Sequence, residues 1–163
     1  MLIKVKNKDT LILDDFTFCC SVGKKGISNN KREGDLRTPK GLFKLGTVYY
    51  RSDRIKNLQT KLALKKIKKN MGWCNDPTSK KYNSLININD KIRCEKLYRK
   101  DKKYDVLIVI NYNTKKTVPF KGSAIFIHLT NNFNGTAGCV ALLKKDLLIL
   151  LKLINKKTKI KIY

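Results

Sequence analysis

The chain has 163 residues and carries 37 Lys and Arg against 12 Asp and Glu, which gives a formal net charge of +25. A hydrophobic content of 42% is enough to build a core. The length favours a single domain spanning residues 1–163, because one core stops growing only at roughly 250–300 residues. One histidine excludes any metal site built from several imidazoles, and five cysteines without a CxxC spacing argue against a disulfide framework or a zinc knuckle.

The basic excess consists almost wholly of lysine. Only six of the 37 basic residues are arginine, the residue that bidentate recognition of bases and phosphates favours. Lysine, asparagine and isoleucine are abundant together, as expected when an A/T-rich genome shapes the codons. Binding of nucleic acid is therefore the less favoured explanation of the charge. A nonenzymatic basic module that attracts an anionic polymer stays open as an alternative.

The N-terminal half has the pattern of short strands separated by polar turns. Apolar alternation predicts strands at residues 2–5, 11–13, 16–22 and 43–50. Charges interrupt the early apolar runs, so neither a signal peptide nor a membrane span is expected there. Residues 23–41 form a long polar stretch with several glycines, and such stretches inside a domain are usually functional or mobile. Residues 53–70 fit both a helical face and an extended edge, and both are left open.

Two apolar, β-branched runs dominate the C-terminal half. Residues 104–112 and 123–129 predict buried strands, and they follow an Asn-Asp-Pro turn at 75–77. Leucines at helical spacing predict a helix over 144–154, and alternation at 160–162 predicts a closing strand. Strands therefore dominate, and the expected class is mainly β, or α+β, with one or two helices.

The chemistry is concentrated where the second of these runs ends. His128, the only histidine, lies eleven residues before the pair Gly138-Cys139. A cysteine nucleophile attacks as a thiolate, so it needs a base within hydrogen-bond reach. Gly138 lets the backbone approach closely, so that N–H groups can be aimed at an oxyanion. The plainer alternative is that Cys139 is an inert core thiol and His128 a hydrogen-bonded structural residue.

The surrounding motifs resemble a known family. His128 followed by Thr-Ala-Gly-Cys-Val at 136–140 resembles the signature of the L,D-transpeptidase catalytic domain, the YkuD family of cell-wall enzymes. Residues 31–43 independently resemble its Asp-Gly-x-Thr-Pro-x-Gly-x-Phe segment. The sequences at 72–74 and 82–83 are similar to its small, single-domain proteobacterial branch.

Two positions depart from the family pattern. Ala141 stands where many members have Arg or Asn, so an anchoring group for the donor has to come from elsewhere. Leu129 replaces the Gly or Ser whose backbone carbonyl orients the histidine in many members. Because any residue supplies a carbonyl, this second change affects the mechanism little.

The resemblance implies a β-sandwich of mixed sheets and acyl transfer through Cys139, with His128 as the base. A thioester with a peptidoglycan stem peptide forms, and the amine of a second stem resolves it into a cross-link. If water resolves it, the enzyme is instead a carboxypeptidase. Backbone N–H groups of Ala137, Gly138 and Cys139 are the expected oxyanion donors, and no metal or cofactor is required.

Four residues are candidates for substrate binding: Lys31, Arg32, Arg37 and Thr136. For the three basic ones, the alternative is that they merely solvate a loop. The expected partners are stem peptides as donor and acceptor. The family works in the periplasm or cell envelope, yet no export signal is evident in these residues, so a cytoplasmic location stays open.

Overall fold

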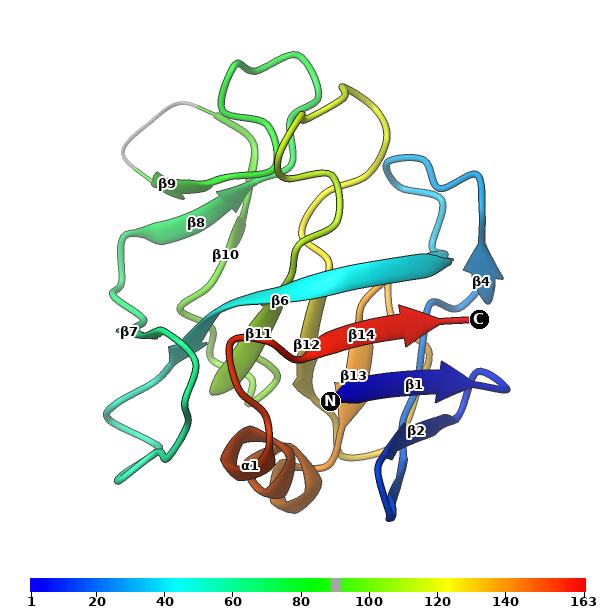
Figure 1. The fold of residues 1–163 in the computed structure, drawn as a ribbon. Helices are drawn as coiled ribbons and strands as arrows, with labels where there is room; N and C mark the ends of the chain where they lie inside the picture. Colours follow the sequence, from blue (N-terminus) through cyan, green and yellow to red (C-terminus); the bar gives the residue numbers. More distant parts are fainter. Residues whose placement is uncertain (89–91) are drawn as a thin grey trace.

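The computed structural model describes residues 1–88 and 92–163, and this part of the chain is built mainly from strands, with one helix (Figure 1). The strands are β1 (Leu2–Lys6), β2 (Thr10–Leu13), β3 (Phe16–Cys19), β4 (Ile27–Ser28), β5 (Thr38–Pro39), β6 (Gly41–Tyr50), β7 (Leu64–Lys66), β8 (Met71–Cys74), β9 (Leu85–Asn87), β10 (Cys94–Lys96), β11 (Val106–Ile110), β12 (Phe126–Leu129), β13 (Val140–Leu142) and β14 (Lys159–Ile162). The helix is α1 (Lys144–Leu153). The predicted mainly β class with one or two helices is confirmed.

The main sheet has nine strands and is mixed. Its order is β13-β12-β11-β6-β14-β1-β2-β3, with β7 beside β6. The long strand β6 joins the two halves, because its first residues pair with β14 and its last with β11 (Figure 1). The pairs β12–β13 and β1–β14 are parallel. A three-stranded sheet, β10-β8-β9, and the short pair β4–β5 complete the fold.

The two faces of β11 and β12 are covered by different elements. All five residues of β11 are buried, and alternate side chains point to opposite faces. On one face, residues such as Ile108 pack with α1 leucines and with the inner residues of β1, β2 and β14. On the other face, Leu107 and Phe126 pack with Trp73 of β8 and with Cys139. This arrangement places the candidate nucleophile on the face covered by the small sheet.

Residues 53–70 contain no helix; they form turns and the short strand β7. Their apolar side chains are nevertheless buried, with Ile55 and Leu62 in one core cluster and Ile67 in the other. A single helix would direct these residues to one side, whereas this segment supplies both cores. The helical spacing was therefore a coincidence of burial at separate places.

The predicted strand at 16–22 ends earlier, at Cys19. Beyond it the chain makes two isolated bridges, Ser21 with Ala141 and Gly23 with Thr136. The polar stretch 23–41 thus begins beside the segment that carries Cys139.

Candidate active site

Cys139 and His128 lie on the same side of two neighbouring strands. The parallel register pairs Ile127 with Val140 and His128 with Ala141. Cys139 therefore lies beside Phe126, whose N–H donates to the Sγ at 3.4 Å. Because side chains alternate along a strand, the side chains of His128 and Cys139 emerge on one face. Both line a single cavity of about 400 Å³.

The loop before Cys139 depends on a glycine and a threonine. Gly138 has φ +148°, and a Cβ there would lie 2.9 Å from the Arg37 carbonyl oxygen. Thr136 Oγ1 accepts from the Gly138 N–H at 3.0 Å and donates to the Cys139 carbonyl at 2.7 Å. The hydroxyl of Thr136 is thus used within the loop, and so is the Gly138 amide that was expected to stabilise an oxyanion.

The His128 ring is fixed by the backbone of the next residue. Its Nδ1 lies 2.9 Å from the Leu129 carbonyl oxygen. A carbonyl only accepts, so Nδ1 carries the proton and Nε2 has the free lone pair. The leucine carbonyl thus makes the orienting bond despite the departure from the family pattern. The Tyr104 ring packs edge-on against the imidazole, with centroids 5.4 Å apart.

Both candidate groups, the thiol of Cys139 and the imidazole of His128, are neutral at rest. Burial lowers the pKa of His128 to about 4, and the nearby charges of Lys103 and Arg99 act in the same direction. Burial, with a contribution from the charge of Glu95, raises the pKa of Cys139 to about 12. Among the described residues, the thiol donates to the Ala124 carbonyl at 3.2 Å and its sulfur accepts from the Phe126 N–H at 3.4 Å, and no hydrogen bond joins it to the imidazole.

Asn83, from the motif at 82–83, fixes the segment that holds the Cys139 thiol. Asn83 Oδ1 accepts from the Ala124 N–H and from the Trp73 indole. The carbonyl of Ala124 in turn receives the Cys139 thiol. Trp73 is buried and packs edge-on against Phe126, so its part in the site is structural.

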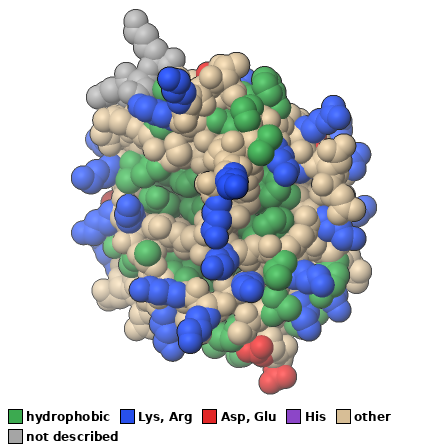
Figure 2. Space-filling view, turned by 45° about the horizontal axis from the view of Figure 1, so that its top comes forward, with side chains coloured by type: hydrophobic (Ala, Val, Ile, Leu, Met, Phe, Trp, Pro, Cys, Tyr) green, Lys and Arg blue, Asp and Glu red, His purple; other side chains and the backbone are tan. Residues whose placement is uncertain are grey.

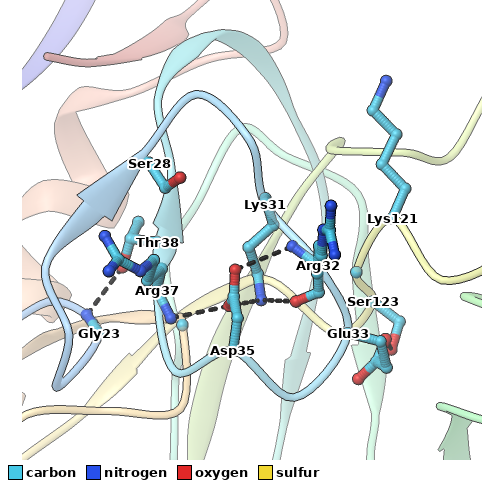
Figure 3. Close-up of polar contacts among 12 residues, drawn as sticks. Gly23, Ser28, Lys31, Arg32, Glu33, Asp35, Arg37, Thr38, Lys121 and Ser123 are labelled. Carbon is cyan, nitrogen blue, oxygen red and sulfur yellow. Dashed lines mark hydrogen bonds and ion pairs between the residues drawn. The ribbon is translucent and has the colours of Figure 1, made fainter.

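The three basic candidates of the long loop are placed very differently (Figure 3). Lys31 is buried and lines the cavity, and its Nζ contacts Asp35 Oδ1 at 2.5 Å. Arg32 and Arg37 are exposed and are not among the cavity-lining residues. Asp35 organises the loop by accepting hydrogen bonds from the backbone N–H groups of Arg32 and Arg37. The hydrogen bond from Lys31, together with these two backbone bonds, lowers the pKa of the Asp35 carboxyl. The backbone of Arg37, rather than its guanidinium, contacts the loop before Cys139, where its carbonyl faces Gly138.

The wall of the cavity contains charged residues that sequence reasoning missed: Lys24, Glu33, Glu95, Arg99 and Lys103. Glu33 belongs to the stretch that carries the second motif, so a local signal existed for it. Residues 94–104 carry no such signal. Elsewhere, Lys and Arg are scattered between apolar patches on the face shown in Figure 2 and do not gather in one stripe.

The part of the chain that the structure describes contains no helix long and apolar enough to cross a membrane. A cluster of three or more His, Cys, Asp or Glu suited to a metal ion is likewise not found in residues 1–88 and 92–163.

Comparison with known proteins gives a family and a fold. The family described as L,D-transpeptidase catalytic domain (YkuD) matches residues 2–162. Two similar solved structures are the helical cell shape determining protein Pgp2 from Campylobacter jejuni and its K307A mutant. Each has 17% sequence identity and a TM-score of 0.53, over 99% of this chain and 46% of that chain. The present chain therefore spans about half the length of Pgp2, and the likeness is one of fold. No curated protein matches the sequence.

Proposed function

The chain belongs to the L,D-transpeptidase catalytic domain family, and on that premise we propose that it is a peptidoglycan L,D-transpeptidase with Cys139 as nucleophile and His128 as general base. One observation carries the proposal. The two side chains emerge on the same face of adjacent parallel strands and line one cavity, and the bond from Nδ1 to Leu129 leaves Nε2 free to accept a proton.

The first half-reaction starts from the neutral pair. The thiol turns from the Ala124 carbonyl toward the imidazole, and its proton passes to Nε2 of His128 as sulfur attacks the stem-peptide carbonyl. A low pKa for His128 and a high one for Cys139 disfavour a standing ion pair, so proton transfer accompanies attack. The terminal D-alanine leaves with the proton from His128, and a thioester remains on Cys139.

Backbone amides stabilise the oxyanion that develops during attack. Since the Gly138 amide donates to Thr136, the amides of Ala137 and Cys139 are the first choice, and the Gly138 amide joins only if it releases that hydroxyl. Lys31 is the basic candidate on the cavity wall, so we assign substrate-carboxylate binding to it rather than to Arg32 or Arg37.

The second half-reaction determines the product. The amine of another stem peptide converts the thioester into a cross-link, whereas water makes the same enzyme an L,D-carboxypeptidase. Both outcomes require the thioester. A nonenzymatic basic module requires none and predicts steeply salt-dependent binding instead.

Intact-protein mass spectrometry after incubation with a tetrapeptide stem tests the proposal. We expect an adduct of the tripeptidyl mass in the wild type and none in Cys139→Ala. The matched control is Cys20→Ala, which removes another buried thiol whose pKa is raised to about 12 but which is not among the cavity-lining residues. Absence of the adduct in wild-type protein whose Cys139 reacts with a small alkylating agent refutes the proposal.

A further inference from the structure

Two carboxylates line the cavity of a chain whose net charge is +25. Glu33 and Glu95 both belong to its wall, and the proposed route to the thioester uses neither of them. They lie near enough for the charge of Glu33 to raise the pKa of Glu95. Tyr82 and Ser123 hold Glu33 by donating to the same oxygen, Oε2, at 2.5 and 2.7 Å.

Glu95 is the carboxylate tied to the reacting pair. It lies on β10, and its Oε1 accepts the hydroxyl of Tyr104, the ring that packs against His128. Arg99 Nη1 lies 3.9 Å from the same oxygen. The side chain keeps 30% of its surface exposed, so the carboxylate is held in place but open to a ligand. Burial raises its pKa, while the Tyr104 bond and Arg99 oppose that rise.

The charge of Glu95 works against the first half-reaction. It raises the pKa of Cys139, because a carboxylate near the sulfur disfavours the thiolate. The sulfur of the thioester is uncharged while the next reactant binds, so this penalty is absent at that stage. A carboxylate in this position therefore hinders formation of the thiolate but does not hinder the binding of an acceptor to the acylated enzyme.

The step that follows brings a cation to the cavity. An acceptor amine with a pKa near that of lysine, about 10.4, arrives as an ammonium at neutral pH, and it must lose a proton before it can attack. Both the net charge and the cations of the wall, Lys24, Lys31, Arg99 and Lys103, repel it. Water meets neither obstacle, so without an anionic contact the thioester would be hydrolysed.

We propose that Glu95 binds the ammonium of the acceptor beside the thioester and accepts its proton. This inference rests on the proposed function. The ammonium gives one proton to the Glu95 carboxylate, and the free amine forms a C–N bond to the thioester carbonyl. The second N–H proton passes to Nε2 of His128, the C–S bond breaks, and the sulfur of Cys139 takes that proton. Glu95 then returns its proton to solvent.

The test is Glu95→Gln, which keeps an oxygen for the Tyr104 hydroxyl and removes the charge. With a tripeptide stem as acceptor at pH 7, we expect the ratio of cross-linked to hydrolysed product to fall about a hundredfold, the low end of general-base contributions. With hydroxylamine, which is uncharged at pH 7, the ratio stays near the wild-type value. Raising the pH reduces the defect about tenfold per unit, because the fraction of unprotonated acceptor rises by that factor, so the variant reaches the wild-type ratio at about pH 9.

A matched control is Asp101→Asn. Asp101 pairs with the same arginine, with 2.7 Å between Asp101 Oδ2 and Arg99 Nη2, but it is not among the cavity-lining residues. This variant loses the same charge and is expected to keep the wild-type product ratio. The thioester adduct, measured by mass in every variant, reports that the protein is folded and acylated.

Four results separate the possibilities. An unchanged product ratio in Glu95→Gln overturns the inference, and so does an equal loss with hydroxylamine. A variant that no longer forms the thioester assigns Glu95 to the donor and overturns it as well. A wild type that forms no thioester refutes the proposed function itself, which is a different failure.

Discussion

Replacing Thr136 by valine separates a structural role of this residue from a role in substrate binding. The substitution keeps the shape of the side chain but removes the hydroxyl that joins the Gly138 amide to the Cys139 carbonyl. Each neutral hydrogen bond contributes about 1 kcal/mol, so the expected loss of unfolding free energy is about 2 kcal/mol. For a domain of this size that corresponds to a Tm lower by about 4–8 °C.

The effect on the Cys139 carbonyl is partly compensated, because Thr38 Oγ1 also lies within hydrogen-bond distance of it, at 3.5 Å. Among the described residues, the Gly138 amide donates only to the Thr136 hydroxyl, so no second partner compensates its loss. The loop before Cys139 therefore loosens. We expect thioester formation to slow through kcat, with little change in KM.

Thermal unfolding and acylation kinetics of Thr136→Val and Thr136→Ser check this reasoning. The serine variant keeps the hydroxyl and should retain most of the stability. Equal Tm values for wild type and Thr136→Val would refute the structural role. A pure KM effect with unchanged stability would instead support the substrate contact predicted from the sequence.

Three further outcomes are expected. Gly138→Ala meets both an unfavourable positive φ and a carbonyl oxygen at 2.9 Å, so thioester formation should be abolished and the Tm lowered; wild-type behaviour in both assays contradicts this. Asp35→Asn leaves the ammonium of Lys31 buried without its charged partner, and urea unfolding should show a loss of about 3 kcal/mol. Below pH 6.5 His128 is protonated in the unfolded chain, whereas in the folded chain it is protonated only near pH 4. The free energy of unfolding therefore falls by up to about 3 kcal/mol as the pH is lowered across that window. His128→Gln should lose less stability over the same pH range, and an identical pH profile would show that burial of this imidazole has no such effect.

Local sequence patterns were sufficient to predict those elements whose burial is continuous along one segment of chain. Continuous apolar, β-branched runs predicted β11 and β12, which are buried along their whole length, and leucines at helical spacing predicted α1, which buries one face. The same reasoning left residues 53–70 undecided between a helix and an extended edge, because the apolar residues there pack into two different cores. Periodicity indicates that a residue is buried, but it does not indicate which elements the residue packs against.

The relation between His128 and Cys139 was predictable for a similar reason. They are eleven residues apart, at the end of one strand and the start of the next, so a single connection brings them to adjacent parallel strands. Their motif is contained within one short piece of chain. Which of the basic loop residues lies on the cavity wall was not predictable. The burial of Lys31 and the exposure of Arg37 depend on how the whole loop folds around Asp35.

By itself, the sequence determined the mainly β class, the family and the candidate pair of reacting residues, since these depend on short-range pattern and composition. Only the tertiary structure decided the state and surroundings of that pair. The neutral thiol and imidazole follow from burial, and the carboxylates of Glu33 and Glu95 reach the cavity from segments about sixty residues apart. Desolvation and charge act through space, and a net charge of +25 does not indicate that Cys139 shares a cavity with two acids.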